Sequence, residues 1–207
     1  VAVNEKGQSL KGTYVVFDLE TTGFSSAKDK IIEIGAVKVE NGEITDKYST
    51  FVNPKIPIPF RITQLTSITD EMVMESPEIE TILPQFLKFV GDAVLVAHNA
   101  SFDVSFIEEN CRRQGIEPDF TSVDTVGLAR VLLPTLSKFK LNVVAKALNI
   151  SQEHHHRAVD DARVTAEIYV KFIQMLEERG IETLDQMNHF GAHNAEAIRK
   201  MPSYHVI

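Results

Sequence analysis

The stretch Val15-Val16-Phe17-Asp18-Leu19-Glu20-Thr21-Thr22-Gly23 joins an apolar run to two acidic residues that are separated by one position. Its β-branched and aromatic residues predict a buried central strand, and side chains in a strand alternate between its two faces. Asp18 and Glu20 therefore share one face, roughly 7 Å apart along the strand. Two like charges this close raise each other's pKa unless a positive charge lies between them. Because carboxylate oxygens suit Mg²⁺ and Mn²⁺, the pair predicts a divalent-cation site.

The composition is that of an ordinary globular protein. The 207 residues, 43% hydrophobic and 24% charged, are enough for one domain with a well-formed core. No apolar run approaches the roughly 20 residues that span a bilayer, and no signal peptide is visible, so we expect no membrane partner. The single cysteine, Cys111, cannot form an internal disulfide, which favours an intracellular, cytoplasmic setting.

The charge balance limits the kind of nucleic-acid partner. A net charge of −8 disfavours a protein that grips long duplex DNA by its backbone, because that mode needs clustered Lys and Arg. A short grip on one strand end remains compatible with this charge. Bound divalent ions would make an acidic site locally positive toward phosphate.

Hydrophobic periodicity predicts an α/β domain with a mixed central sheet. After the first strand, at about residues 13–21, strands are expected at 31–39 and 44–52, and Asn41-Gly42 predicts a type I′ turn between these two. The three strands should form an antiparallel meander. Further strands alternate with helices, an order typical of a mixed sheet with helices on its faces. These strands are expected at residues 93–97 and near 122–123, and the helices at 76–91, 98–115, 124–133, 141–148 and 160–179, with short helical turns between 61 and 69.

Two prolines affect the helix predicted at residues 76–91. Ser76 and Pro77 suit its N-cap and its first helical position. Pro84 lies inside the apolar pattern and predicts a kink or a short break.

The domain organisation follows from these elements. Residues 1–12 are polar and are interpreted as a lead-in segment outside the core, and residues 13–180 form the domain. Residues 181–207 are expected to be a C-terminal helical extension or the start of a following region. The chain begins without Met and ends in strand-like residues, which fits a domain excised from a larger protein and, almost as well, a trimmed free-standing protein.

Two further acids are expected at the same edge of the sheet. Asp103 lies in the first turn of the helix that follows strand 93–97, and ligands of open α/β sheets bind at the carboxyl ends of strands. Asp160 and Asp161 both begin the long helix, but only Asp161 has apolar or small residues three, four and seven positions later, so Asp161 should face inward. Four converging carboxylates suit a two-metal centre that clamps the attacking and leaving oxygens of a phosphoryl displacement.

A general base is also available near these acids. His156 lies five residues before Asp161, and a neutral imidazole can accept a proton from water near pH 7. The run His154-His155-His156 also allows a zinc interpretation. The solitary Cys111 and the surrounding oxygen donors favour magnesium or manganese instead.

Three segments resemble the three motifs of the DEDDh family of 3′-to-5′ exonucleases, the DnaQ-like branch of the ribonuclease H-like fold. They are Asp18-Leu19-Glu20-Thr21-Thr22-Gly23, His98-Asn99-Ala100-Ser101-Phe102-Asp103 and His156-Arg157-Ala158-Val159-Asp160-Asp161. The resemblance covers about residues 12–180. It implies this fold and two bound magnesium or manganese ions, with His156 as the general base. The implied metal ligands are Asp18, Glu20, Asp103 and Asp161.

The same resemblance implies contacts with the substrate. Thr21, Thr22, Gly23 and Phe24 would line the 3′-terminal nucleotide. Leu65 and Thr66 would pack near its base, and Asn99 and Phe102 match the second motif. Ser67 stands where the family often has glycine.

Residues 13–23, 95–103 and 155–162 more narrowly resemble the proofreading exonuclease that is inserted in PolC-type replicative DNA polymerases. This implies an enzyme that releases nucleoside 5′-monophosphates from single-stranded DNA 3′ ends, within or bound to a polymerase. Two alternatives remain open. One is an RNA-trimming relative with the same site, and the other is a non-catalytic module that binds a 3′ end or a polymerase partner.

Overall fold

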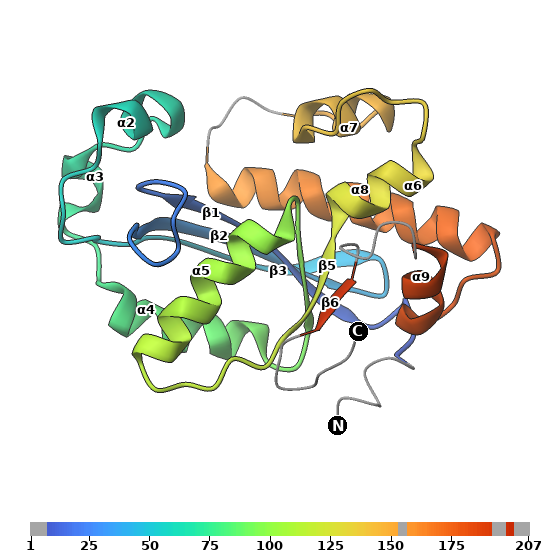
Figure 1. The fold of residues 1–207 in the computed structure, drawn as a ribbon, viewed down its shortest axis with the longest axis horizontal. Coiled ribbons are helices and arrows are strands. Elements are labelled where there is room, and N and C mark those ends of the chain that lie inside the picture. The colour runs from blue at the N-terminus through green and yellow to red at the C-terminus, as the bar shows by residue number, and fades with distance from the viewer. Residues whose placement is uncertain (1–7, 153–156, 192–197, 201–207) are drawn as a thin grey trace.

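The computed structural model describes residues 8–152, 157–191 and 198–200, arranged around one mixed sheet (Figure 1). The strand order is β3-β2-β1-β4-β5-β6. The predicted antiparallel meander is confirmed, and β4 and β5 continue the sheet parallel to β1. A short β6, which was not predicted, pairs antiparallel with β5. The strands are β1 (Thr13–Thr21), β2 (Ile31–Glu40), β3 (Glu43–Phe51), β4 (Val94–Ala97), β5 (Thr121–Asp124) and β6 (Ile198–Lys200).

The helices lie on both faces of this sheet. Figure 1 shows α6, α7 and α8 over one face and α4 and α5 over the other. Among the residues that the structure describes, no helix has the length and apolarity needed to cross a membrane. The helices are α2 (Phe60–Thr66), α3 (Asp70–Met74), α4 (Ile79–Val90), α5 (Ala100–Arg113), α6 (Thr125–Leu132), α7 (Leu141–Ala147), α8 (Ala158–Glu178) and α9 (Leu184–Phe190).

The structure confirms the predicted turn at Asn41 and Gly42 but not the predicted helix start at Pro77 or a break at Pro84. Asn41 and Gly42 have φ of 51° and 79°, which confirms a turn with two positive φ angles. The prediction that Pro77 begins a helix is wrong, because its carbonyl accepts the N–H of Asn53 at 2.9 Å and α4 begins two residues later. The break that Pro84 allowed does not occur, since α4 continues through it with buried residues on both sides.

The alternation along β1 assigns its side chains to two hydrophobic cores. Val16 lies in the core that contains the α8 residues Ala166 and Tyr169. Val15 and Phe17 lie in the opposite core, which includes residues of α4 and α5. Asp18 and Glu20 follow Val16 at intervals of two, so they continue the face that α8 covers.

The segment before β1 is attached to the C-terminal part of the domain. Leu10 is only 1% exposed, although residues 1–12 were expected to lie outside the core. Its N–H donates to the carbonyl of Glu182 at 2.9 Å, and Ser9 forms a β-bridge with Thr183. This pairing buries Leu10 beside Leu184 in the α8-side core.

Candidate active site

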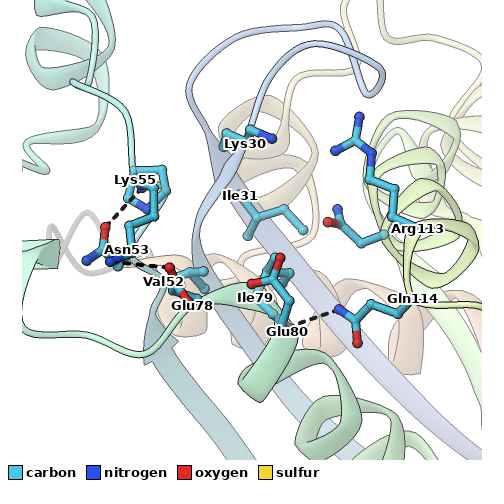
Figure 2. Close-up of a pocket in the computed structure, with 12 residues that line it drawn as sticks. Lys30, Ile31, Val52, Asn53, Lys55, Glu78, Ile79, Glu80, Arg113 and Gln114 are labelled. Carbon is cyan, nitrogen blue, oxygen red and sulfur yellow. Dashed lines mark hydrogen bonds and ion pairs between the residues drawn. The ribbon is translucent and has the colours of Figure 1, made fainter.

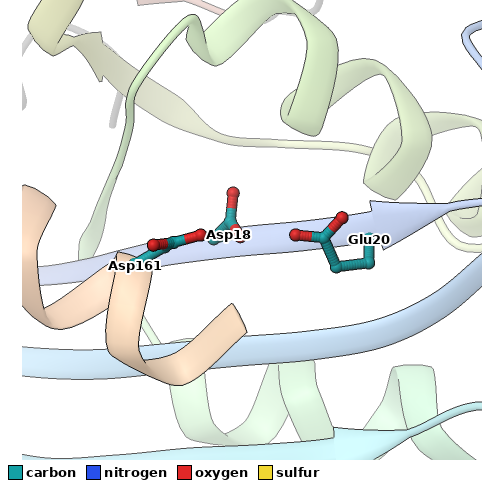
Figure 3. Close-up of side chains that lie close together, drawn as sticks. All are labelled: Asp18, Glu20 and Asp161. Atoms are coloured by element: carbon teal, nitrogen blue, oxygen red, sulfur yellow. The ribbon is translucent and has the colours of Figure 1, made fainter. Parts of the chain in front are cut away.

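Three of the four predicted carboxylates meet at the end of β1. One ligand atom each from Asp18, Glu20 and Asp161 lies within 4.8 Å of the others, so the group could hold a metal ion. Figure 3 shows two of the side chains rising from β1 and the third reaching toward them from the first turn of α8. Asp160 is not a member of the group, which agrees with the inward orientation predicted for Asp161.

The approach of α8 depends on the residues of β2 beside this group. Antiparallel pairing places Gly35 opposite Asp18 and Glu33 opposite Glu20, on the face that α8 covers. A Cβ atom at Gly35 would lie 2.0 Å from the backbone nitrogen of Val159. The first turn of α8 therefore packs directly on β2, and this contact brings Asp161 to the acids of β1.

Asp103 reaches the same strand from the other side. The parallel pairing of β1 with β4 extends to Val16 opposite Val96. Three residues later, the N–H of Leu19 donates to Oδ1 of Asp103 at 3.1 Å. Asp103 is not part of the three-carboxylate group, but its charge is close enough to raise the pKa of Asp18. The convergence predicted for four acids thus appears as three grouped carboxylates with Asp103 beside them.

The start of α5, which carries Asp103, is held by Asp124 at the end of β5. Asp124 is the N-cap residue of α6, since its Oδ1 accepts the N–H of Val126 at 3.0 Å. The same oxygen accepts the N–H groups of Asn99 at 2.9 Å and Ala100 at 3.2 Å. One buried carboxylate therefore fixes the beginnings of both α5 and α6.

The electrostatics of the acidic group favour a bound cation. Burial raises the pKa of Asp18 well above its usual value, and the charges of Asp103 and Glu20 raise it further. Burial also raises the pKa of Glu20 to about 7, with contributions from Asp161 and Glu33. Among the described residues, Oδ2 of Asp18 is buried without a hydrogen-bond partner. A divalent cation would satisfy this oxygen and neutralise the repulsion, so the donor set fits such an ion.

These pKa shifts predict that the stability of the metal-free protein falls as pH rises, whereas the gain in stability from a bound cation increases. With the pKa of Glu20 at about 7 instead of 4.5, the folded metal-free state binds more protons than the unfolded state between these values. Its stability should therefore fall as pH rises through this window. Because cations bind the ionised carboxylates, added Mn²⁺ should raise Tm more at about pH 8 than at about pH 5.5. Calorimetric scans in chelator and in Mn²⁺ test this, and a metal-induced rise in Tm that is larger at the lower pH would contradict it.

Two of the predicted nucleotide contacts have hydroxyls that are engaged within the protein. Oγ1 of Thr21 donates to the carbonyl of Gly23 at 2.7 Å. Oγ1 of Thr22 accepts the N–H of Lys30 at 2.9 Å. Gly23 has a steric role as well, because a Cβ there would lie 2.5 Å from Oδ2 of Asp29. The structure thus shows how these residues shape the loop after β1, and their substrate contacts stay predictions.

The other predicted contacts divide into exposed and internal side chains. Phe24 and Leu65 are 72% and 70% exposed, so both are free to meet a ligand. The ring centroid of Phe24 lies 6.3 Å from that of Phe102, so the two rings form an aromatic pair at the residue that precedes Asp103 in sequence. Thr66 is buried, and its hydroxyl donates to the carbonyl of Ile62 at 2.8 Å. The side chain of Asn99 forms no cap on α5, although its backbone takes part in the contact with Asp124.

Ser67 occupies a conformation that glycine prefers. It ends α2 with φ 65° and ψ 11°, in the left-handed region that costs a residue with a Cβ about 1–2 kcal/mol. Ser67→Gly should therefore raise the free energy of unfolding by about 1 kcal/mol and Tm by about 2–4 °C, as measured by calorimetry. Ser76→Gly is the matched control, since Ser76 is not among the residues with positive φ, and it should not stabilise. An unchanged or lower Tm in Ser67→Gly would contradict the expectation.

The general base proposed from the sequence, His156, lies outside the described residues, as do His154 and His155. The described chain resumes at Arg157, which donates from Nε to Oε2 of Glu33 at 2.8 Å. Glu33 was given no role from the sequence, although a carboxylate within the apolar run of β2 was a usable signal.

A separate cavity lies away from the acidic group. It is bordered by the start of β2, the end of β3 and residues of α4 and α5, and none of the four predicted metal ligands lines it (Figure 2). Its lining mixes cationic and acidic side chains, and Lys55 pairs with Glu78 at 3.3 Å. The labelled lining residues are Lys30, Ile31, Val52, Asn53, Lys55, Glu78, Ile79, Glu80, Arg113 and Gln114. This cavity is therefore separate from the candidate metal site.

Comparisons with known sequences identify the family of this chain. The family model described as Exonuclease, RNase_T, matches residues 15–169. The chain is 53% identical over 208 residues to the DNA polymerase III PolC-type of Clostridium perfringens, covering 100% of the chain and 14% of the relative. It is 47% identical over 206 residues to the DNA polymerase III PolC-type of Caldanaerobacter subterraneus subsp. tengcongensis, covering 100% and 15%. The chain thus spans about a seventh of the length of these relatives.

Comparisons with solved structures support the predicted fold. An exonuclease X complex with 5′ overhanging duplex DNA aligns with a TM-score of 0.69 and 30% identity, over 86% of this chain and 99% of that one. The nuclease domain of 3′hExo, a DEDDh family member bound to rAMP, aligns with a TM-score of 0.71 and 19% identity, over 94% and 100%. The predicted ribonuclease H-like fold is confirmed. The chain belongs to the Exonuclease family and is an exonuclease domain.

Proposed function

We propose that this domain is a metal-dependent 3′-to-5′ exonuclease that removes nucleoside 5′-monophosphates from single-stranded DNA 3′ ends. The observation that carries the proposal is the group of three carboxylates with an unpartnered buried oxygen on Asp18. Asp18, Glu20, Asp103 and Asp161 would together hold two Mg²⁺ or Mn²⁺ ions. Bound at this site, the ions would activate water and stabilise the departing 3′ oxygen.

The side chains of the protein would orient the terminal nucleotide and accept the proton of the attacking water. His156 precedes α8 by two positions and would accept the proton from the attacking water. Phe24 and Leu65, both exposed, would contact the terminal base by stacking and apolar packing. Asp103 would keep its position through the N–H of Leu19, which partly opposes the rise in the pKa of Asp103 that its burial causes.

A replicative polymerase is the proposed partner. The two curated relatives described above carry the PolC-type polymerase III name, and this chain matches about a seventh of each. We infer that the domain is embedded in or bound to such a polymerase and removes misincorporated nucleotides in the cytoplasm. Its acidic net charge suits a role in which other parts of the assembly hold the duplex.

The proposed function is tested with 5′-labelled oligonucleotides. Single-stranded DNA with Mg²⁺ or Mn²⁺ should be shortened stepwise from its 3′ end, with nucleoside 5′-monophosphates as products and no reaction in chelator. A matched RNA oligonucleotide separates DNA from RNA preference, and faster RNA cleavage would favour the RNA-trimming alternative. Binding of a 3′ end without cleavage in any divalent metal would favour the non-catalytic alternative and sink this one.

Phe24→Ala should weaken substrate binding more than it slows the chemistry. Base stacking on an aromatic ring contributes about 1–3 kcal/mol per base, so KM for a short DNA strand should rise about tenfold with kcat little changed. Steady-state kinetics measure both constants. Ile44→Ala is the control, since Ile44 is an exposed apolar residue on β3 with no predicted substrate contact. Equal KM values in wild type and Phe24→Ala would remove Phe24 from the nucleotide site.

A further inference from the structure

Glu33 is a fully buried carboxylate beside the acidic group. Its side chain is 0% exposed, and it lies opposite Glu20 in the pairing of β1 with β2. Its charge also raises the pKa of Glu20. A buried carboxylate is costly unless it is paired and hydrogen-bonded, so the contacts of Glu33 must offset that cost.

Both oxygens of Glu33 contact the chain that enters α8. Oε2 accepts from Nε of Arg157 at 2.8 Å, and Oε1 accepts the N–H of Ala158 at 3.1 Å. Arg157 occupies the N-cap position, but its side chain makes no cap hydrogen bond. Glu33 therefore supplies, from a strand 124 residues away in sequence, the acceptor that a capping side chain normally provides.

Arg157 is held on a second side by an aromatic ring. Its guanidinium lies over the ring of Phe51, on β3, at 4.2 Å from the centroid. Arg157, which directly precedes α8, is thus fixed by an ion pair to β2 and a cation–π contact to β3. Asp161 lies in the first turn of the same helix, so its position depends on where the helix begins.

We propose that Glu33 is a positioning residue that sets where α8 begins and thereby aligns Asp161 with the acids of β1. The inference rests on the proposed function, because it assigns Glu33 a role in that reaction. It also distinguishes Glu33 from a metal ligand. Its two oxygens are engaged by donors of residues 157 and 158, and it is not a member of the three-carboxylate group.

Two substitutions separate the contacts of Glu33. Glu33→Gln keeps an oxygen for the N–H of Ala158 but removes the charge that pairs with Arg157, whereas Glu33→Ala removes both contacts. Since a displacement of about 1 Å can cost about 100-fold in rate, we expect kcat to fall about tenfold in Glu33→Gln and about 100-fold in Glu33→Ala, with KM within about twofold. A purely structural role would lower Tm and leave kcat per folded molecule unchanged. Glu40→Gln, an exposed acid at the far end of β2, is the matched control.

Binding of Mn²⁺ without substrate gives a readout that is independent of turnover. Calorimetric titration should show Mn²⁺ affinity within a few-fold of wild type in Glu33→Gln. A loss as large as that of Asp18→Asn would identify Glu33 as a ligand and overturn the proposal. Combining Glu33→Gln with Arg157→Gln should cost less in kcat than the product of the two single losses, because both disrupt one contact.

The possible results distinguish the inference from the proposed function. Wild-type kcat retained in folded Glu33→Ala would overturn the inference while leaving the nuclease assignment intact. If Glu33→Ala does not fold, Glu33→Gln decides the test. The inference is then overturned when Glu33→Gln keeps wild-type kcat and the loss of kcat in the double variant equals the product of the two single losses. A wild-type protein without metal-dependent cleavage would instead sink the proposed function.

Discussion

Asp18→Asn should lower the rate of 3′-end cleavage by about 10³-fold or more while leaving the metal-free protein at least as stable as wild type. A bound metal ion contributes several kcal/mol of transition-state stabilisation, and each 1.36 kcal/mol changes the rate tenfold. The amide is isosteric but provides no charge for the cation. Removing a carboxylate whose pKa is raised by burial and by Asp103 relieves repulsion in the folded state.

Single-turnover cleavage of a labelled strand and thermal unfolding in chelator measure the two halves of this expectation. Asp161→Asn should behave in the same way, because its carboxylate belongs to the same group. Asp160→Asn is the matched control one position earlier on α8, and it should retain wild-type activity. Residual activity above about one tenth in Asp18→Asn would remove Asp18 from the metal site.

The acids could be predicted from the sequence because each lies in a local pattern. Strand alternation placed Asp18 and Glu20 on one face, and helical spacing selected Asp161 over Asp160. Both inferences need only the residues within one element. The turn at Asn41 and Gly42 was predictable for the same reason.

The contacts that assemble the site could not be predicted, because they join elements that are distant in sequence. Glu33 carried a local signal, an acid in an apolar strand, but nothing in that signal identified Arg157 as its partner. The hydroxyls of Thr21 and Thr22 matched a nucleotide-binding motif, yet in the structure they hold the loop after β1. Leu10 lies in a polar segment and is buried only because that segment pairs with residues before α9.

Gly35→Ala should have the largest effect on stability of any single methyl group added near the site. The new Cβ would meet backbone atoms on α8, at 2.0 Å from the nitrogen of Val159 and 2.2 Å from the carbonyl carbon of Ala158. Neither atom can move aside as a flexible side chain would, so α8 or β2 must shift. We expect a loss of about 3 kcal/mol or more in the free energy of unfolding, at the upper end of overpacking effects.

The same displacement should also disrupt catalysis, which distinguishes Gly35 from an ordinary packing residue. If the first turn of α8 moves away from β2, Asp161 moves away from Asp18 and Glu20. A shift of about 1 Å can cost about 100-fold in rate. Denaturant unfolding and cleavage by the folded fraction measure the two effects. In the control Gly115→Ala, the Cβ meets no atom within 4 Å and only the positive φ is strained, so about 1–2 kcal/mol should be lost with activity intact. If Gly35→Ala matched this control in both measurements, direct packing of α8 on β2 could not be what brings Asp161 to the metal-binding acids.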